Sequence, residues 1–563
     1  MSYKENFKNS FFFDVLEYMN WVQFEEYPVN EQEVPSAAST CSNNSNKNLI
    51  LDEGEDNKSD ISTEVEKDLE KNSCIQNCDS MAESSLKGKE GTEFDPFLVD
   101  WHGPDDPENP LNWKPWKKGL IMFEVMLLTS INYMGSSIYT PGQEEIQREF
   151  HVGHVVATLN LSMYVLGYGI GPMILSPLSE YARFGRLHIY IISMFLFTIF
   201  QIGAATVHNI GGLIVIRFIS GILCSPALAT GGGTLADFLD PKTLPRYIGL
   251  WSLGFMSAPV SAPLLGACMV VAKDWRWIFW LLLFMSVALF VMLIFFFPET
   301  HHGNILHRRA QRLRKETGDD RYYTLQIREE ANLTLGPFLK KCLLKPFKLI
   351  IQEPIILSFD LYLAVCYGIF YLFFEAFPLV FVGIYNFTLI ELGLSYLGFC
   401  VGCVFAYPIF LTFFNKFITP KFANNTFTPE HFMVLSKYIC WFLPLALFFF
   451  GWTAKVHWIL PIISEMFFVI GVFNLFQTLF SYLALCYTEH LSSVYAGNGF
   501  FRSIFASAFP LFGQAMFNNL GTKNYPVAWG SSLLGFIAIG LTLIPIVIYK
   551  YGGYLRSKSS FSG

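Results

Sequence analysis

Two charged residues lie in or beside one long apolar run, and both could take part in proton chemistry. Arg217 occurs in GGLIVIRFISG, about six residues inside the run, or about 9 Å into a helix that rises about 1.5 Å per residue. A charge at that depth in a membrane is expensive and usually faces a cavity or a partner. Asp237 follows near the membrane edge, where a carboxylate could exchange protons with water. A packed, paired arginine and an ordinary loop aspartate remain the plainer alternatives.

The stretch GYGIGPMILSPLSEYARFGR, which starts at Gly167, combines features of a helix contact and of a latch. Gly167 and Gly171 lie four apart on one helix face, where small residues let two helix backbones approach each other in lipid. The stretch ends in charges, among them Glu180 and Arg186. The Glu180 carboxylate could meet the positive N-terminal end of a helix that starts on the same side, such as the one near Tyr495. We therefore expect a packing hinge followed by a conformational latch.

Small residues and prolines repeat every four positions in GFMSAPVSAPLLG. The small residues share one helical face, and the prolines lie beside it: Gly254, Ala258, Ala262 and Gly266, with Pro259 and Pro263. Such a face predicts either close packing against a neighbouring helix or a bendable seam between two halves of the molecule.

Aromatic side chains crowd the segment CYGIFYLFFEAF, and four of them can share one helical face: Tyr367, Phe370, Tyr371 and Phe374. Packing against lipid or against the protein core is the default for such a stripe, and an apolar substrate-binding cavity is the alternative. Further charges fall within or near the apolar runs, and some of them could carry protons: Glu124, Asp360, Glu375, Glu465 and Arg502.

Membrane-spanning helices must position these residues. The chain is 52% hydrophobic and 15% charged, whereas soluble domains carry roughly 25% charged residues. Apolar runs of about 20 residues can cross a bilayer as helices, and twelve such runs occur here, six on each side of a polar interval. We expect an all-α integral membrane protein made of two six-helix bundles. An ATP-driven pump is disfavoured, because no Gly-rich phosphate loop ending in Gly-Lys-Ser/Thr occurs.

The same runs divide the chain into five parts: a mostly disordered N-terminal tail (1–110), a first bundle (111–298), a central loop (299–350), a second bundle (351–549) and a short C-terminal tail (550–563). Placing both tails in the cytoplasm puts most loop arginines and lysines there, as the positive-inside rule requires. Within the tail, FFFDVLEYMNWVQF could form an amphipathic helix, but we favour a weakly structured segment. The basic run of the central loop could bind anionic headgroups, but we favour a solvated linker helix.

Several longer pieces occur in a fixed order: WHGPDDPENPLNW, SPLSEYARFGR, RFISGILCSPALATGGGTLADF, APVSAPLLG, DWRWIFW and FFPET. Together they resemble the fungal drug:proton antiporters of the twelve-span branch of the major facilitator superfamily, from about Asp100 to Phe561. The resemblance implies a major facilitator fold and a monomeric plasma-membrane exporter, not an enzyme. Such an exporter expels lipophilic drugs, azole antifungals among them, in exchange for protons. We expect membrane lipid around it, and no cofactor, bound metal or nucleic acid.

Three motifs of that family map onto this sequence. The loop motif after the second span maps onto Glu180, Gly185 and Arg186, the span-four motif onto Arg217 with Asp237 following, and the antiporter motif onto Gly254, Pro259, Pro263 and Gly266.

We expect Arg217 to tune a proton site, Asp237 to be one candidate carrier, and Glu180 and Arg186 to latch the cytoplasmic gate. The antiporter motif usually has glycine where this sequence has Ala258 and Ala262, and the added methyl groups leave the tightness of that helix seam open. Ser220 is a separate departure, since the span-four motif often has glutamine there. A proton-coupled nutrient importer and a membrane sensor are the alternative functions.

Overall fold

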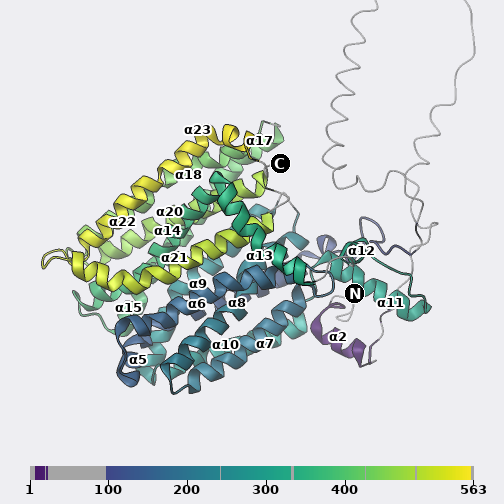
Figure 1. Ribbon diagram of the computed structural model, residues 1–563, viewed down its shortest axis with the longest axis horizontal. Helices are drawn as coiled ribbons and strands as arrows, with labels where there is room; N and C mark the ends of the chain where they lie inside the picture. The colour runs from purple at the N-terminus through teal and green to yellow at the C-terminus, as the bar shows by residue number, and fades with distance from the viewer. Residues whose placement is uncertain are drawn as a thin grey trace, which may run out of the picture.

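The chain forms a bundle of long helices in a computed structural model that describes residues 7–19, 21–22, 24, 95, 97–240, 243–330, 335–424, 426–487 and 491–559. Within these residues no extended strand forms. Figure 1 shows the long helices running roughly parallel, with the first half of the chain and the second half side by side. This arrangement confirms the predicted fold class, an all-helical membrane protein with two bundles.

The first half contains the six predicted spans as helices that alternate in direction. They are apolar around their whole circumference, as expected for helices whose surroundings are lipid and other helices. Their bounds, with the short elements between the first two spans, are α4 (Pro115–Ser137), η3 (Thr140–Gly142), α5 (Gln143–Phe150), α6 (His154–Ser179), α7 (Gly185–Thr206), α8 (Ile210–Phe238), α9 (Leu244–Ala272) and α10 (Arg276–Phe296).

The second half repeats this plan, with several spans built from two consecutive helices. In the described part of the chain, eleven helical segments are long and apolar enough to cross a membrane, and α21 runs beside them where the eleventh span was predicted. The bounds are α14 (Pro354–Phe377), η4 (Pro378–Val382), α15 (Leu389–Ser395), α16 (Leu397–Phe413), η5 (Phe414–Ile418), α17 (Thr419–Ala423), η6 (Pro429–Phe432), α18 (Met433–Ile439), α19 (Phe442–Thr453), α20 (Ile459–Cys486), α21 (Leu491–Leu520), α22 (Ala528–Leu541) and α23 (Leu543–Ser557).

Glycines bring the corresponding helices together in each half. A methyl group added at Gly167 of α6 would come 3.0 Å from the backbone nitrogen of Ile222 in α8. One added at Gly402 of α16 would come 3.0 Å from the Cα atom of Met466 in α20. The second span therefore packs on the fourth as the eighth packs on the tenth, because only glycine permits backbones to approach this closely.

The two halves meet mainly along α6 with α21 and along α9 with α16. We call the end of the bundle that carries α2 and α11 the α11 end, and the opposite end, with α5 and α15, the α5 end (Figure 1). At the α5 end His154 lies 3.1 Å from the Glu375 carboxylate across the interface. Toward the α11 end Gln477 donates to Ser252 at 2.7 Å. The halves thus touch near both ends, with the centre of the molecule closed off between them.

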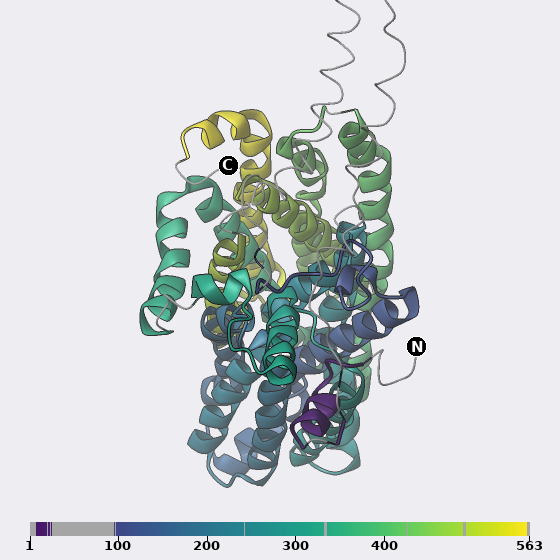
Figure 2. The same ribbon diagram turned by 90° about the vertical axis from the view of Figure 1, so that its right-hand side faces the viewer.

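Segments that precede the first span pack against the central loop at the α11 end. The elements involved are α2 (Phe11–Tyr18), η2 (Pro110–Asn112), α11 (His302–Thr317), α12 (Leu325–Glu330) and α13 (Leu335–Gln352). Figure 2 looks onto this end and shows α2 in purple near the teal α11, over the first half. Arg309 of α11 forms ion pairs with Asp106 at 2.9 Å and Glu108 at 2.8 Å.

Two expectations from the sequence are therefore wrong. The segment FFFDVLEY is a helix, and α11 is not a solvated linker, since the side chains of Arg309 and Arg312 are 4% and 6% exposed. The physical reason is charge pairing between distant segments: Asp106 and Arg309 are 203 residues apart. Local hydropathy contains no information about such a pair. The disorder predicted for residues 25–94 concerns a part of the chain that the structure does not describe.

Candidate functional site

A cluster of four tyrosines closes the centre of the molecule between the halves. Tyr367 and Tyr371 lie one turn apart on α14 in the second half, and they meet Tyr133 of α4 and Tyr168 of α6 in the first. The Tyr168 hydroxyl is 2.7 Å from that of Tyr367 and donates to that of Tyr371 at 3.1 Å. Tyr133 and Tyr367 are also hydrogen-bonded through their hydroxyls. These bonds hold the halves together at mid-depth.

A small enclosed cavity adjoins this cluster. It measures about 20 Å³, on the order of the space for one water molecule. Both halves contribute to its wall, which consists of Tyr133, Phe255, Met256, Pro259, Tyr367, Phe370, Val472, Phe476 and Arg502. The chemistry of the wall is therefore aromatic and aliphatic, with hydroxyl groups and one arginine as its polar features.

The predicted aromatic face of span seven divides between cavity and core. Tyr367 and Phe370 line the cavity, and Tyr371 adjoins it through its hydrogen bond. Phe374 packs on Tyr396 instead, with ring centroids 5.3 Å apart. All four side chains of the face are buried in protein, so none of them faces lipid.

Most first-half residues of this centre were not predicted from the sequence. Tyr133 and Tyr168 were not singled out, although a hydroxyl inside an otherwise apolar span is a recognisable signal. Phe255 was also missed, and nothing in its apolar surroundings distinguishes it from core residues.

A buried carboxylate lies beside the cavity arginine. Asn498 of α21 donates to the Asp360 carboxylate of α14 at 2.7 Å, and Arg502 follows Asn498 by four residues on the same helix face. The other oxygen of Asp360 and the Nε atom of Arg502 are buried without a hydrogen-bond partner in the described structure. The Arg502 guanidinium lies 4.7 Å from the ring centre of Tyr367. The ionisable acid Asp360 is thus linked to the cavity wall through Asn498 and Arg502, which lie one turn apart on α21.

Arg217 lies fully inside the first half, where backbone carbonyls and rings surround its charge. It donates to the carbonyl oxygens of Asn160 at 3.2 Å and Ser136 at 3.1 Å. Its guanidinium carbon is 4.4 Å from the ring centre of Tyr164. The Ser136 hydroxyl in turn accepts a hydrogen bond from Tyr371 at 2.9 Å. Arg217 is therefore joined to the tyrosine cluster through Ser136.

Asp237 is placed with Arg186 rather than with Arg217. It lies 20 residues beyond Arg217 on α8, or about 30 Å along the helix at about 1.5 Å per residue. Arg186 of α7 donates two hydrogen bonds to the Asp237 carboxylate, of 2.5 Å and 3.0 Å. The Thr300 hydroxyl donates a third at 3.0 Å. A bidentate pair of this kind is strong and directional, so the structure assigns Asp237 to the charged cluster at the α11 end.

Glu299 anchors the start of α7 in the same cluster. Its carboxylate accepts from the backbone nitrogens of Arg186 at 3.0 Å and Leu187 at 3.1 Å, where the helix dipole favours a negative charge. Gly185 makes this approach possible: it has φ of +66°, and a methyl group there would collide with the Glu299 carboxylate and come 2.8 Å from Asn304. The predicted latch glycine thus has a structural explanation.

Substituting Gly185 by alanine should destabilise the protein more than the same change at Gly318. Both glycines have positive φ, but a methyl group at Gly318 meets nothing within 4 Å. Gly318→Ala should therefore cost only the left-handed backbone strain, about 1–2 kcal/mol. Gly185→Ala also displaces Glu299 and leaves buried amides unpaired, at about 1–3 kcal/mol more. Thermal unfolding of the purified variants measures the difference, and equal losses would contradict this account of Gly185.

Glu180 caps the end of α6, and its backbone carbonyl accepts from Gln326 of α12 at 3.2 Å. In this part of the described structure, the carboxylate of Glu299 meets a helix N-terminus, that of α7. Contact between Glu180 and the start of α21 stays a prediction, since residues 488–490 lie outside the described part of the chain.

The small-residue face of α9 packs on α4 within the first half. A methyl group at Gly254 would come 3.2 Å from Met126 of α4, and one at Gly266 would collide with the backbone carbonyl of Ile138. Pro259 contributes its carbonyl as an acceptor for the α4 hydroxyl of Ser137, and Pro263 lies buried in the same helix. Other residues of α9 meet the second half, so the helix lies between a tight seam with α4 and the interface of the two halves.

The remaining acids predicted near the spans have separate surroundings. Glu375 faces His154 at the α5 end. Glu124 and Glu465 are completely buried, and neither carboxylate has a hydrogen-bond partner in the part of the protein that the structure describes. Neither of these two lines the cavity.

Residues 125–510 match the protein family described as the Major Facilitator Superfamily. This chain is similar to Fluconazole resistance protein 1 of Saccharomyces cerevisiae, with 63% identity over 484 residues, which cover 86% of this chain and 88% of the relative. It is also similar to the multidrug transporter FLR1 of Candida glabrata, with 59% identity over 562 residues and 100% coverage of both chains.

The fold is also similar to a solved structure, the partially occluded inward open conformation of the xylose transporter XylE from E. coli. The TM-score is 0.53 and the identity 14%, with 77% of this chain and 99% of that chain covered. At this identity the likeness shows the fold alone.

Proposed function

Because the chain belongs to the Major Facilitator Superfamily, we propose that it exports lipophilic drugs, azole antifungals among them, in exchange for protons by alternating access. The observation that carries this proposal is the aromatic cavity, whose wall comes from both halves. A rocking movement of two halves around a central site exposes that site to each side of the membrane in turn. The names of the relatives, a fluconazole resistance protein and a multidrug transporter, support the substrate class.

The wall chemistry supports drugs over polar nutrients. Phe255, Phe370 and Phe476 offer apolar surface, which binds varied lipophilic molecules without requiring a fixed hydrogen-bond pattern. A polar nutrient would leave its hydroxyl or amino groups unpaired against these rings, at a cost of about 1–3 kcal/mol for each buried group. Tyrosine hydroxyls and Arg502 remain available to orient one polar group of a drug.

The α11 end is the cytoplasmic side in this proposal, and the membrane is the plasma membrane. Arginines and lysines gather on α11 and the segments around it, which agrees with the positive-inside rule. We call the ion pair of Arg186 and Asp237 the cytoplasmic clasp. Glu180 lies in the loop between α6 and α7, just before Arg186.

Asp360 is the proton carrier we propose beside the drug site. Protonation removes the negative charge of Asp360, whose partner Asn498 lies one helix turn from Arg502 in the cavity wall, and so changes the charge balance beside the drug site. Arg217 tunes the same centre from the first half, through Ser136 and Tyr371. One proton moving down about 100 mV and one pH unit supplies about 2.3 and about 1.4 kcal/mol. A hundredfold drug gradient requires roughly 2.8 kcal/mol, so one proton suffices.

Drug accumulation in cells that lack their own drug exporters tests this function. Cells producing the protein should accumulate several-fold less labelled fluconazole than control cells, and an uncoupler should abolish the difference. Equal accumulation with confirmed surface production would contradict export. Uncoupler-sensitive gain of a labelled nutrient would favour an importer. A transcriptional response to drug without any efflux would favour a sensor.

Phe370 lines the cavity, whereas Phe374 packs on Tyr396, so we expect replacement of these two residues to have different effects on drug export. Phe370→Ala should change which drugs are exported, because that ring lines the cavity. Phe374→Ala should leave the drug profile nearly unchanged and instead lower stability by about 3–5 kcal/mol, as for other buried aromatic rings. Resistance profiles against a drug panel, corrected for surface amount, measure both effects. Identical profiles for the two variants would contradict this assignment of the cavity wall.

A further inference from the structure

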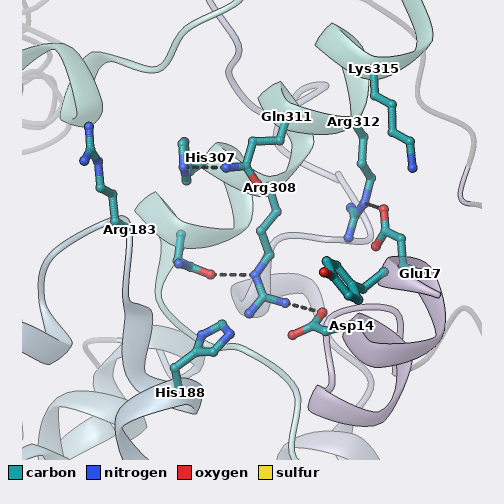
Figure 3. A pocket seen from close by; sticks show the side chains of 11 residues that line it. Asp14, Glu17, Arg183, His188, His307, Arg308, Gln311, Arg312 and Lys315 are labelled. Carbon is teal, nitrogen blue, oxygen red and sulfur yellow. Dashed lines mark hydrogen bonds and ion pairs between the residues drawn. The ribbon is translucent and has the colours of Figure 1, made fainter. Parts of the chain in front are cut away.

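A second and larger hollow lies at the α11 end, outside the transport path. It measures about 410 Å³, within the size range of small-molecule sites, and opens between α2, α11 and the start of α7. Figure 3 shows basic and imidazole side chains around it, from the loop before α7, from α7 and from α11: Arg183, His188, His307, Arg308, Arg312 and Lys315.

Positive charge predominates in this hollow. Among the described residues, its lining contains three arginines, one lysine and two carboxylates, Asp14 and Glu17. Each carboxylate already pairs with an arginine, Asp14 with Arg308 at 2.6 Å and Glu17 with Arg312 at 3.1 Å. Arg183 approaches from the opposite side with its side chain exposed. Cations therefore outnumber carboxylates among the described residues of the lining.

Arg308 lines the hollow, and one of its donors makes no hydrogen bond in the described structure. Its side chain is 11% exposed, and its Nη2 atom is buried without a hydrogen bond in the described structure, with Glu299 the nearest carboxylate in ion-pair range at 4.0 Å. A buried charged donor without an acceptor is costly, so an added anionic oxygen would stabilise it. Burial, and then the cations Arg314, Arg183 and Arg308, hold the pKa of His307 below its usual range, as a positive potential requires.

The hollow lies at the depth of lipid headgroups. His188 belongs to the first turn of α7, and Phe12 of α2 contacts Phe295 in the last turn of α10, with ring centroids 4.9 Å apart. Nearby on α2 and just after it, Tyr18 and Trp21 are 89% and 70% exposed. Exposed tyrosine and tryptophan side chains are typical of the membrane interface. An anion held by a lipid can therefore reach the hollow from the adjacent leaflet.

We propose that this hollow is a binding site for a phosphate-bearing anion, the phosphorylated headgroup of an anionic lipid. Guanidinium groups bind phosphate oxygens through paired hydrogen bonds, and Arg183 and Arg308 both line the hollow, with Arg183 on the side away from Asp14 (Figure 3). The headgroup would bridge the loop before α7 to α11. It would thereby stabilise the α11 end, where the clasp of Arg186 and Asp237 lies.

Binding to the full chain in phosphatidylcholine nanodiscs tests this site. Short-chain phosphatidylinositol 4,5-bisphosphate should bind saturably, and Arg183→Gln should weaken it about tenfold, a loss of about 1.4 kcal/mol. Arg183 is exposed, so this variant keeps the fold. Arg321→Gln is the matched control: it also removes one loop arginine, but Arg321 is exposed, pairs with Asp319 and does not line the hollow. The control should bind within about twofold of the parent.

Two soluble probes distinguish the source of the phosphate. Inositol trisphosphate should bind more weakly than the lipid if the membrane supplies the headgroup. Equal affinities would assign the same site to a free phosphate ester, and inorganic phosphate alone shows whether one group suffices. The proposal is overturned if no probe binds saturably, or if Arg321→Gln weakens binding as much as Arg183→Gln. The second result would mean diffuse attraction to a basic surface.

Discussion

We expect Arg217→Ala to lower the rate of drug efflux about a hundredfold, with normal amounts of protein at the surface. The Arg217 guanidinium joins the carbonyls of Asn160 and Ser136, and a hydrogen bond to a charged group contributes about 1.5–3 kcal/mol. Since about 1.4 kcal/mol corresponds to a tenfold change in rate, losing both contacts accounts for the effect. Ser136 would also lose its fixed position beside Tyr371. Efflux of a fluorescent drug per surface molecule is the measurement.

Arg217→Lys should give an intermediate rate, because an ammonium group keeps the charge but cannot bridge both carbonyls with a planar fork. Arg276→Ala is the matched control. That arginine pairs with Glu149 at 2.7 Å at the α5 end, where the pair is partly exposed, so its loss should leave efflux nearly unchanged. Efflux at the parental rate in Arg217→Ala would contradict the proposed role.

Asp360→Asn should uncouple drug movement from protons. Asparagine imitates the protonated carboxyl group but cannot release a proton, so a pH gradient can no longer drive the cycle. We expect stimulation by a gradient of one pH unit, worth about 1.4 kcal/mol, to disappear. Exchange of drug for drug across the membrane should continue, because the cavity wall is intact. Uptake into vesicles with and without a gradient separates these two activities.

Glu465→Gln is the control for Asp360→Asn. Glu465 is an equally buried acid, but it lies on α20 beside Gly398, whereas Asp360 accepts from Asn498, one helix turn from the cavity residue Arg502. Neutralisation of Glu465 should preserve stimulation by the pH gradient. If Glu465→Gln uncouples transport and Asp360→Asn does not, the carrier has been assigned to the wrong helix.

The spans and several contact faces could be predicted because their signals are local. Runs of apolar residues locate the helices, and a four-residue spacing puts Gly167 and Gly171 on one face, which packs on α8 as the spacing predicts. The face from Gly254 to Gly266 likewise packs closely. Its direction, toward α4, could not be deduced, because a smooth face does not specify its neighbour.

The candidate site was harder to predict because its contacts join distant parts of the chain. Asp237 and Arg217 share one helix, and nothing local indicates that Asp237 pairs with Arg186, 51 residues earlier. The tyrosine cluster joins helices about 200 residues apart. The N-terminal segments were assigned to a tail from their polar composition, since Asp14 and Asp106 find their arginines only in the folded chain.

Drug movement driven by an imposed pH gradient in purified proteoliposomes tests the central claim most directly. With the protein oriented so that its α11 end faces outward, an acidic lumen should drive uptake of a fluorescent drug from outside. An uncoupler should abolish this uptake, and Asp360→Asn should lack it. Uptake equal to that of protein-free vesicles, for every drug that the protein exports from cells, would contradict proton-coupled export.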